Sequence, residues 1–229
     1  MPADATALVR RALGGSGIEL VASCAAAAYD AVAPAAFRSS AWLTGARGVV
    51  VAGSAGSALW RGFRARMAER PELWQAEHPY DAYVAELLSR ADRALEAAGV
   101  RFQRFEAAYH APVRVDFLAM AKLVGLGTPG PFMLLIHPEH GPWWALRGAW
   151  IVDAEVEPQR ACVAAPCAGC AAPCVGGWEN GRGIADATPA VRSRCVVGQG
   201  SRYDEDQIAY HYDRAAAARL RKGLQKSVI

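Results

Sequence analysis

The run Gly48-Val-Val-Val-Ala-Gly53 constrains the fold most, because it is continuously apolar, rich in β-branched side chains and bounded by glycine. β-Branched residues favour strands. A strand without polar alternation along its length is typical of one that is buried on both faces. We therefore expect this segment to lie inside a sheet that other elements cover on either side.

The spacing of apolar residues around this run predicts helices and strands in an α+β arrangement. Residues 79–99 give the clearest helix, because their apolar positions fall on one face. Further helices are expected over residues 5–13, 54–70, from Asp116 to the glycine-rich stop GLGTPG, and from 204–206 to 215–220. Further strands are expected over 18–22, 101–106, 132–136 and 145–152, the last two joined by the hairpin-like connection HPEHGPWW.

Length and composition predict one soluble domain over residues 1–229, with a Cys-rich loop at about 158–200. The net charge of +3 comes from interleaved charges, which argues against nucleic-acid or membrane-surface binding and suits a small anionic ligand. No stretch has the length or apolarity of a signal peptide or a membrane span. We therefore expect a cytoplasmic protein.

Cysteines gather in one part of the chain, where Cys162, Cys167, Cys170 and Cys174 fall within thirteen residues and Cys195 follows. In a reducing compartment such crowding favours a soft-metal site over disulfides. Cys167, Cys170, Cys174 and Cys195 are the expected ligands, with Cys162 as the alternate. Free or redox-active thiols are the competing interpretation.

The densest group of reactive and aromatic residues is IHPEHGPWWALRG, residues 136–148. A turn of this composition can present an imidazole and aromatic faces to one ligand. In the alternative interpretation Trp143 and Trp144 alternate between core and surface, and His137 only bonds a loop carbonyl.

This stretch resembles the corresponding segment of the cobalamin-processing family of the cblC type, in which Ile-His-Pro, Gly-x-Trp and aliphatic-Arg-Gly follow in this order. The similarity extends to FRSSAWLTGARGVVVAGSAGSALWRGF and to RCVVGQGSRYDEDQIAY. It implies a flavin-nitroreductase-like mixed sheet flanked by helices, which binds cobalamin. Members of the family remove the upper axial ligand of cobalamin reductively or by transfer to glutathione.

The resemblance also implies sites for cobalamin and for glutathione. Arg147, Arg194 and Arg219 match arginines that hold glutathione carboxylates, a task for which a planar guanidinium is suited. The residues expected to contact cobalamin are glycines, prolines and rings near the turn: Gly125, Gly127, Pro131, Phe132, His137, Gly141, Trp143 and Trp144.

The Cys-rich insert is similar to motifs of epoxyqueuosine reductase-like and corrinoid iron–sulfur reductases. One [4Fe–4S] cluster, with zinc as the alternative, is the cofactor expected there.

Three functions remain open at this point. The first is an enzyme, a cobalamin reductase or dealkylase, that uses glutathione, reduced flavin or a cluster as the electron source. The second is a cobalamin-dependent reductase of a separate organic substrate, which needs an acid such as Tyr109, His110 or Glu139. The third is a non-catalytic carrier. Partners expected by analogy are a second copy of the chain, an electron donor and a cobalamin-accepting protein.

Overall fold

The computed structural model describes residues 4–108, 111, 114–130, 134–158, 165–171, 174, 188–213, 215 and 217–219. Its main sheet has the strand order β1–β2–β6–β3, and each neighbouring pair is antiparallel. The strands span Leu20–Ala25 (β1), Gly48–Ala55 (β2), Trp144–Val152 (β6) and Phe102–Glu106 (β3). The α+β class is confirmed, whereas the expected mixed sheet is wrong for the described strands, because none of these pairs is parallel.

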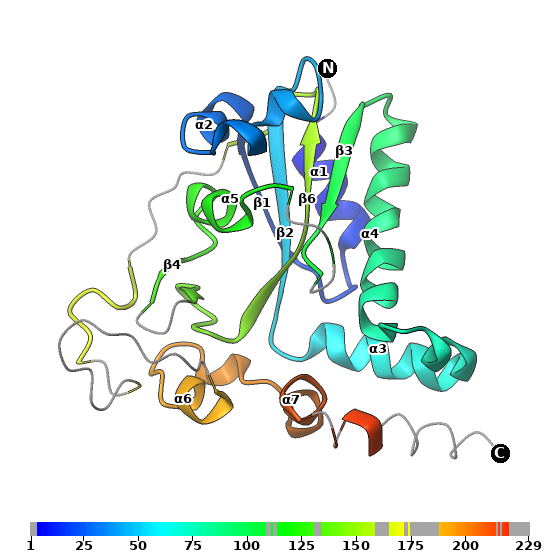
Figure 1. Ribbon diagram of the computed structural model, residues 1–229, viewed down its shortest axis with the longest axis vertical. Coiled ribbons are helices and arrows are strands. Elements are labelled where there is room, and N and C mark those ends of the chain that lie inside the picture. The colour runs from blue at the N-terminus through cyan, green and yellow to red at the C-terminus, as the bar shows by residue number, and fades with distance from the viewer. Residues whose placement is uncertain are drawn as a thin grey trace.

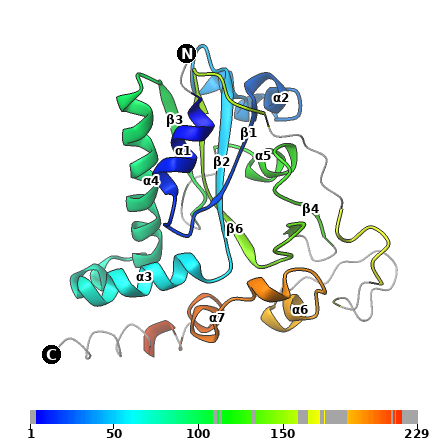
Figure 2. The same cartoon turned by 180° about the vertical axis from the view of Figure 1, so that it is seen from behind.

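Helices lie on both faces of this sheet, as Figure 1 and Figure 2 show from opposite sides. Helices α1 (Ala5–Leu13), α3 (Ala58–Glu69) and α4 (Pro79–Ala97) pack into the hydrophobic core on one face. Helices α2 (Ala26–Asp30) and α5 (Phe117–Leu123) belong to the core on the other face. The 3₁₀ turns η1, η2 and η3 span Ala35–Phe37, Ser39–Ala41 and Pro71–Gln75.

Strand β2 supplies side chains to both cores, as its apolar run predicts. Val50 and Ala52 point into the core with α1, α3 and α4, whereas Val49 and Val51 point into the opposite one. All four side chains are fully buried. Burying a valine side chain contributes of the order of 2 kcal/mol through the hydrophobic effect, so the valines of β2 stabilise both layers at once.

The expected hairpin across HPEHGPWW is wrong. Strand β5 (Leu135–Ile136) pairs instead with β4 (Thr128–Pro129) in a small sheet of its own. The connection closes on itself, since the backbone amides of His137 and Gly141 each donate to the carbonyl of the other at 2.9 Å. On β6, β2 takes one side from Trp144 to Val152, whereas β3 takes the other side only from Gly148 to Val152. The closed His137–Gly141 loop and the pairing with β4 keep β5 away from the remaining edge.

Most other predicted elements are present with shifted ends. Helix α3 begins at Ala58 rather than at Ser54, because Ser54 and Ala55 continue β2 and pair with β6. The first strand begins at Leu20, later than predicted, and runs on to Ala25. Helices α1 and α4 follow the predicted boundaries closely.

The C-terminal segment forms α6 (Pro189–Ser193), the 3₁₀ turn η5 (Gln199–Ser201) and α7 (Glu205–Tyr212). Helix α7 lies beside α3, seen at the lower edge of Figure 1. The amide of Asp204 donates to Ser57 Oγ at 2.8 Å, and Arg61 and Arg64 of α3 pair with Asp204 and Asp206. Helix α7 ends at Tyr212 because Asp213 has an extended backbone (φ −125°, ψ 105°). Residues 215 and 217–219 are helical again, so the predicted helix is interrupted rather than continuous.

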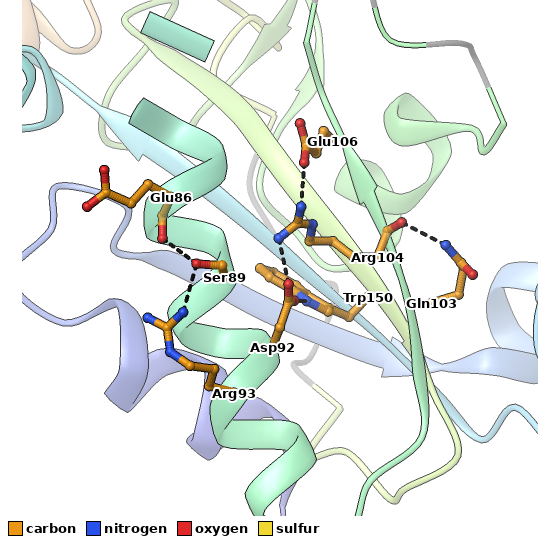
Figure 3. A network of polar contacts seen from close by, with 8 residues as sticks. All are labelled: Glu86, Ser89, Asp92, Arg93, Gln103, Arg104, Glu106 and Trp150. Atoms are coloured by element: carbon orange, nitrogen blue, oxygen red, sulfur yellow. Dashed lines mark hydrogen bonds and ion pairs between the residues drawn. The ribbon is translucent and has the colours of Figure 1, made fainter. Parts of the chain in front are cut away.

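A polar network joins α4 to the edge of the sheet (Figure 3). Asp92 of α4 accepts hydrogen bonds from Trp150 Nε1 at 2.7 Å and from Arg104 Nη1 at 2.5 Å. Arg104 also donates to Glu106 Oε1 at 2.6 Å. Because the Trp150 side chain is fully buried, its indole N–H depends on Asp92 for a partner.

Replacing Asp92 tests this attachment. We expect Asp92→Ala to lower the free energy of unfolding by about 2–4 kcal/mol, because it leaves a buried indole N–H without an acceptor and Arg104 without one of its two carboxylates. Asp92→Asn keeps an acceptor for Trp150 and should lose roughly half as much. Urea denaturation followed by tryptophan fluorescence measures both. Equal losses in the two variants would contradict the role given to Trp150.

Candidate functional site

A cavity of about 420 Å³ opens where the start of β6 meets the C-terminal segment. Strand β6 supplies Trp144 to Arg147, whereas Arg192 comes from α6 and His211 and Tyr212 from α7. The rest of the lining is mainly apolar and consists of Leu118, Leu134, Leu135, Pro142 and Tyr203. This is the arrangement of an organic-ligand site, with apolar walls and a few polar groups at one end.

A second cavity of about 800 Å³ adjoins the first, and the two share Leu118, Leu134 and Leu135. Helix α5 forms one wall with Ala119, Lys122 and Leu123, and the β4 turn forms another with Pro129 and Gly130. We call the two together the joint cavity. Its lining is largely apolar, with Asp116, Lys122, Arg147 and Arg192 as the charged groups.

Trp144 is fixed in the wall of the joint cavity. Its indole Nε1 donates to the Leu135 carbonyl at 2.8 Å, which ties β6 to β5. Gly127 lies against the same ring, and a Cβ there would be 3.0 Å from Trp144 Cζ2. Glycine at 127 is therefore needed for this position of the ring, and Gly125 (φ +74°) is needed for the turn before it.

Arg147 lies near the start of β6 and lines the first cavity. Its Nε donates to Ser54 Oγ at 2.8 Å, and its Cζ lies 5.2 Å from the centre of the Tyr80 ring. Among the described residues no carboxylate pairs with it. A cation without a counter-ion beside an apolar cavity favours an anionic ligand.

Arg192 reaches the same cavity from α6. Its Nη1 donates to the Pro142 carbonyl at 3.2 Å, and its Cζ lies 5.4 Å from the Tyr212 ring centre. Burial raises the pKa of the nearby Tyr203, against the lowering effect of Arg147 and Arg192. The phenol therefore stays protonated between the two cations.

His211 completes this end of the cavity. Its ring packs edge-to-face on Tyr80, with centroids 5.1 Å apart. Burial, together with smaller effects of the charges of Arg147 and Arg192, lowers its pKa from 6.5 to about 4. The imidazole is therefore neutral near pH 7 and does not repel an anion or add to the positive charge.

The His137–Gly141 loop is organised by hydrogen bonds to its own backbone. His137 Nδ1 accepts from the amides of Glu139 and His140 at 3.1 and 3.2 Å, so its proton is on Nε2. Gly141 (φ +56°) is pressed against Val197, whose carbonyl oxygen would lie 2.1 Å from a Cβ. Both residues thus have a structural role, although His137 accepts from loop amides, whereas the alternative interpretation of the sequence had it bond a loop carbonyl.

Glu139, His137 and Gly125 line a different cavity of about 830 Å³, together with Glu19 and Glu157. Trp143 is fully buried and packs against Tyr203, with ring centroids 5.3 Å apart. The described residues predicted to contact cobalamin are therefore divided. Trp144 lies on the joint cavity and Gly127 behind it, Gly125 and His137 line the other cavity, Gly141 lies in the loop and Trp143 in the core.

The remaining predicted residues lie away from the cavity or outside the described residues. Arg194 is exposed at the end of α6, and Arg219 is exposed and pairs with Asp213 at 3.8 Å. Neither lines the joint cavity. Tyr109, His110, Pro131, Phe132 and Cys162 lie outside the described residues.

The four other predicted cysteine ligands are neighbours. Burial raises the pKa of the Cys167 thiol, and Cys195, Cys174 and Cys170 raise it further. Cys167 and Cys174 pack with Ile136, Leu134 and Val191. Within the described part of the chain, however, no three metal-ligating side chains are arranged to hold one ion. The metal site stays a prediction.

Sequence reasoning missed Arg192, Tyr203 and His211. The resemblance places an arginine nine residues before Tyr203, which selects Arg194. Arg192 comes two residues earlier, and two residues along a helix are enough to turn a side chain to a different face. The position of His211 depends in part on distant rings, since Trp60 of α3 and Tyr80 of α4 pack on it beside the nearby Tyr203 and Tyr210.

No helix in the described residues is long and apolar enough to span a membrane.

Acid titration of His137 gives a stability prediction. Burial lowers its pKa from 6.5 to about 4, with a smaller contribution from His140. Between these values the unfolded chain binds a proton that the folded chain does not, so the free energy of unfolding falls as the pH falls, by up to about 3 kcal/mol. Urea unfolding at pH 7, 5.5 and 4.5 should show that the free energy of unfolding falls less steeply with pH in His137→Gln than in the wild type. Equal slopes for the two proteins would contradict this.

Comparison with known proteins places this geometry on a known fold. No family model matches the sequence, and no curated protein matches it either. Among solved structures, the chain resembles a B12-trafficking protein CblC of C. elegans, described as a human MMACHC homologue, with a TM-score of 0.60 at 14% identity. The match covers 96% of this chain and 94% of that one.

Epoxyqueuosine reductases share part of the fold. The enzyme from Streptococcus thermophilus gives a TM-score of 0.50 at 17% identity, over 85% of this chain and 54% of that one. A complex of epoxyqueuosine reductase with a tRNA stem loop gives 0.50 at 14% identity, over 72% and 48%. The chain thus corresponds to about half of those enzymes. Over nearly its whole length it has the fold of the B12-trafficking protein CblC, as the resemblance in its sequence predicts.

Proposed function

We propose that the chain binds cobalamin in the joint cavity and removes its upper axial ligand with the help of a small anionic thiol, glutathione. The observation that carries this proposal is the pairing of a wide apolar cavity with two arginines at one end. The CblC-like fold over almost the whole chain supports it.

The residues around the joint cavity fit a corrin ring. Trp144 and the leucines of α5 and β5 offer the broad apolar surface that such a ring needs. Thr128, next to Pro129 in the wall, has a buried Oγ1 without a hydrogen-bond partner among the described residues. An amide side chain of cobalamin would satisfy it. When bound, cobalamin supplies the cobalt centre from which the upper ligand is lost.

The protein's own contribution is to position the thiol. Arg147 and Arg192 would hold its carboxylates, and a guanidinium can do so through two parallel hydrogen bonds. The apolar walls would exclude water from the space between the two arginines and the corrin ring. His211, being neutral, leaves the positive charge to the two arginines.

Anaerobic incubation with methyl- and cyanocobalamin, with and without glutathione or reduced flavin, tests the proposal. We expect the visible spectrum to change on binding, and the upper ligand to be lost faster when glutathione is present. Binding without ligand loss under any reductant would leave a carrier. No spectral change with any cobalamin would refute the proposal.

Substitution of single arginines locates the thiol subsite. Arg147→Gln and Arg192→Gln should each raise the KM for glutathione roughly tenfold or more, because each removes charge-assisted hydrogen bonds. The cobalamin spectrum should be unchanged. Arg194→Gln is the matched control on the same helix. A loss with Arg194→Gln but not with Arg192→Gln would restore the assignment made from the sequence.

Metal analysis of anaerobically purified protein tests the cysteine prediction. A [4Fe–4S] cluster or a zinc ion held by Cys167, Cys170, Cys174 and Cys195 predicts bound iron or zinc that Cys167→Ala removes. Metal-free protein with freely reactive thiols would contradict it. No electron-transfer step through a cluster is part of the proposed reaction.

A further inference from the structure

The Arg147 guanidinium is constrained from two directions before any ligand enters. Its Nε end is tied to Ser54 Oγ at 2.8 Å, at the end of β2. One side of it is covered by the Tyr80 ring, whose centre lies 5.2 Å from Cζ. Among the described residues the two Nη nitrogens have no hydrogen-bond partner, so they are available at the cavity that Arg147 lines.

Tyr80 itself is held rigidly and does not line that cavity. It is the second residue of α4, only 5% exposed, and its ring packs edge-to-face on Phe63 with centroids 5.1 Å apart. Its hydroxyl has no hydrogen-bond partner among the described residues. Burial raises the pKa of this phenol to about 12, so the ring meets Arg147 as a neutral aromatic face.

We infer that Tyr80 and Ser54 are positioning residues, which orient Arg147 so that its two Nη groups receive a carboxylate of the anionic thiol. This inference rests on the proposed function for the identity of the ligand. A guanidinium over an aromatic face is attracted by the ring quadrupole, and a hydrogen bond at Nε fixes rotation about the side chain. The remaining edge has the geometry for bidentate pairing with a carboxylate.

The chain offers a matched control for the aromatic ring. Tyr83 lies on the same helix and also packs on Phe63, with centroids 5.8 Å apart, but it makes no ring contact with Arg147. Tyr80→Leu removes the aromatic face beside Arg147, Tyr80→Phe keeps it, and Tyr83→Leu removes a ring from the same cluster without touching Arg147.

Steady-state kinetics give the first readout. We expect Tyr80→Leu to raise the KM for glutathione about fivefold at unchanged kcat, in line with the strength of a partly buried cation–π contact. Ser54→Ala should have a similar effect. Tyr80→Phe and Tyr83→Leu should behave as the wild type. Equal losses in Tyr80→Leu and Tyr83→Leu, or a loss in Tyr80→Phe, would overturn the inference.

A second readout needs neither turnover nor ligand. In ¹H–¹⁵N spectra of the free protein, the Arg147 Nε–H signal, assigned by its loss in Arg147→Lys, should be shifted by the Tyr80 ring current and protected from exchange. The shift should disappear in Tyr80→Leu and remain in Tyr80→Phe. An unshifted, rapidly exchanging signal in the wild type overturns the positioning role. If the Arg147 signal is shifted and protected as expected but glutathione does not speed the loss of the upper ligand, the positioning role stands and the proposed function is overturned instead.

Discussion

Pairing of β2 with β6 at the centre of the sheet is the interaction on which the rest of the structure depends. Both strands are apolar on both faces, so each face must be covered by helices before the pair is stable. Val51 of β2 lies opposite Ala149 of β6, and both are fully buried. The same two strands continue past the register shift between Ala52 and Gly53, where Arg147 lines the cavity and donates to Ser54. The candidate site is thus built on the extension of the central strand pair.

Sequence patterns predicted the elements that are specified by residues close to one another in the chain. The run from Gly48 specifies β2, the apolar spacing specifies α1 and α4, and Asp116 caps α5 by accepting from the Ala119 amide at 2.9 Å. The partner of β5 could not be predicted in this way. It depends on the folded loop rather than on the strand itself: the closed connection from His137 to Gly141 directs β5 to β4, although β3 covers β6 only along Gly148–Val152.

The candidate site was predicted in part for the same reason. Trp144 and Arg147 both lie on β6, so the motif places them in one strand. Arg147 falls at the register shift opposite Ala52 and Gly53, so strand alternation alone does not fix its direction. Arg192 and His211 lie on short helices, and the face that such a helix turns to the cavity depends on packing against Pro142 and Tyr80. A resemblance in sequence identifies neighbouring arginines but does not distinguish between two of them on one helix turn.

The contact between Gly141 and Gly198 has a consequence for the wall of the cavity. Gly198 (φ +76°) approaches the His140 carbonyl so closely that a Cβ would lie 2.1 Å from its oxygen, and Gly141 approaches Val197 in the same manner. The two backbones touch with no side chain between them. Every larger residue at either position would force the His137–Gly141 loop and the segment before η5 apart. Pro142 follows Gly141 directly and its carbonyl accepts from Arg192 of α6 at 3.2 Å, so this seam also supports the part of the cavity wall where the loop meets α6.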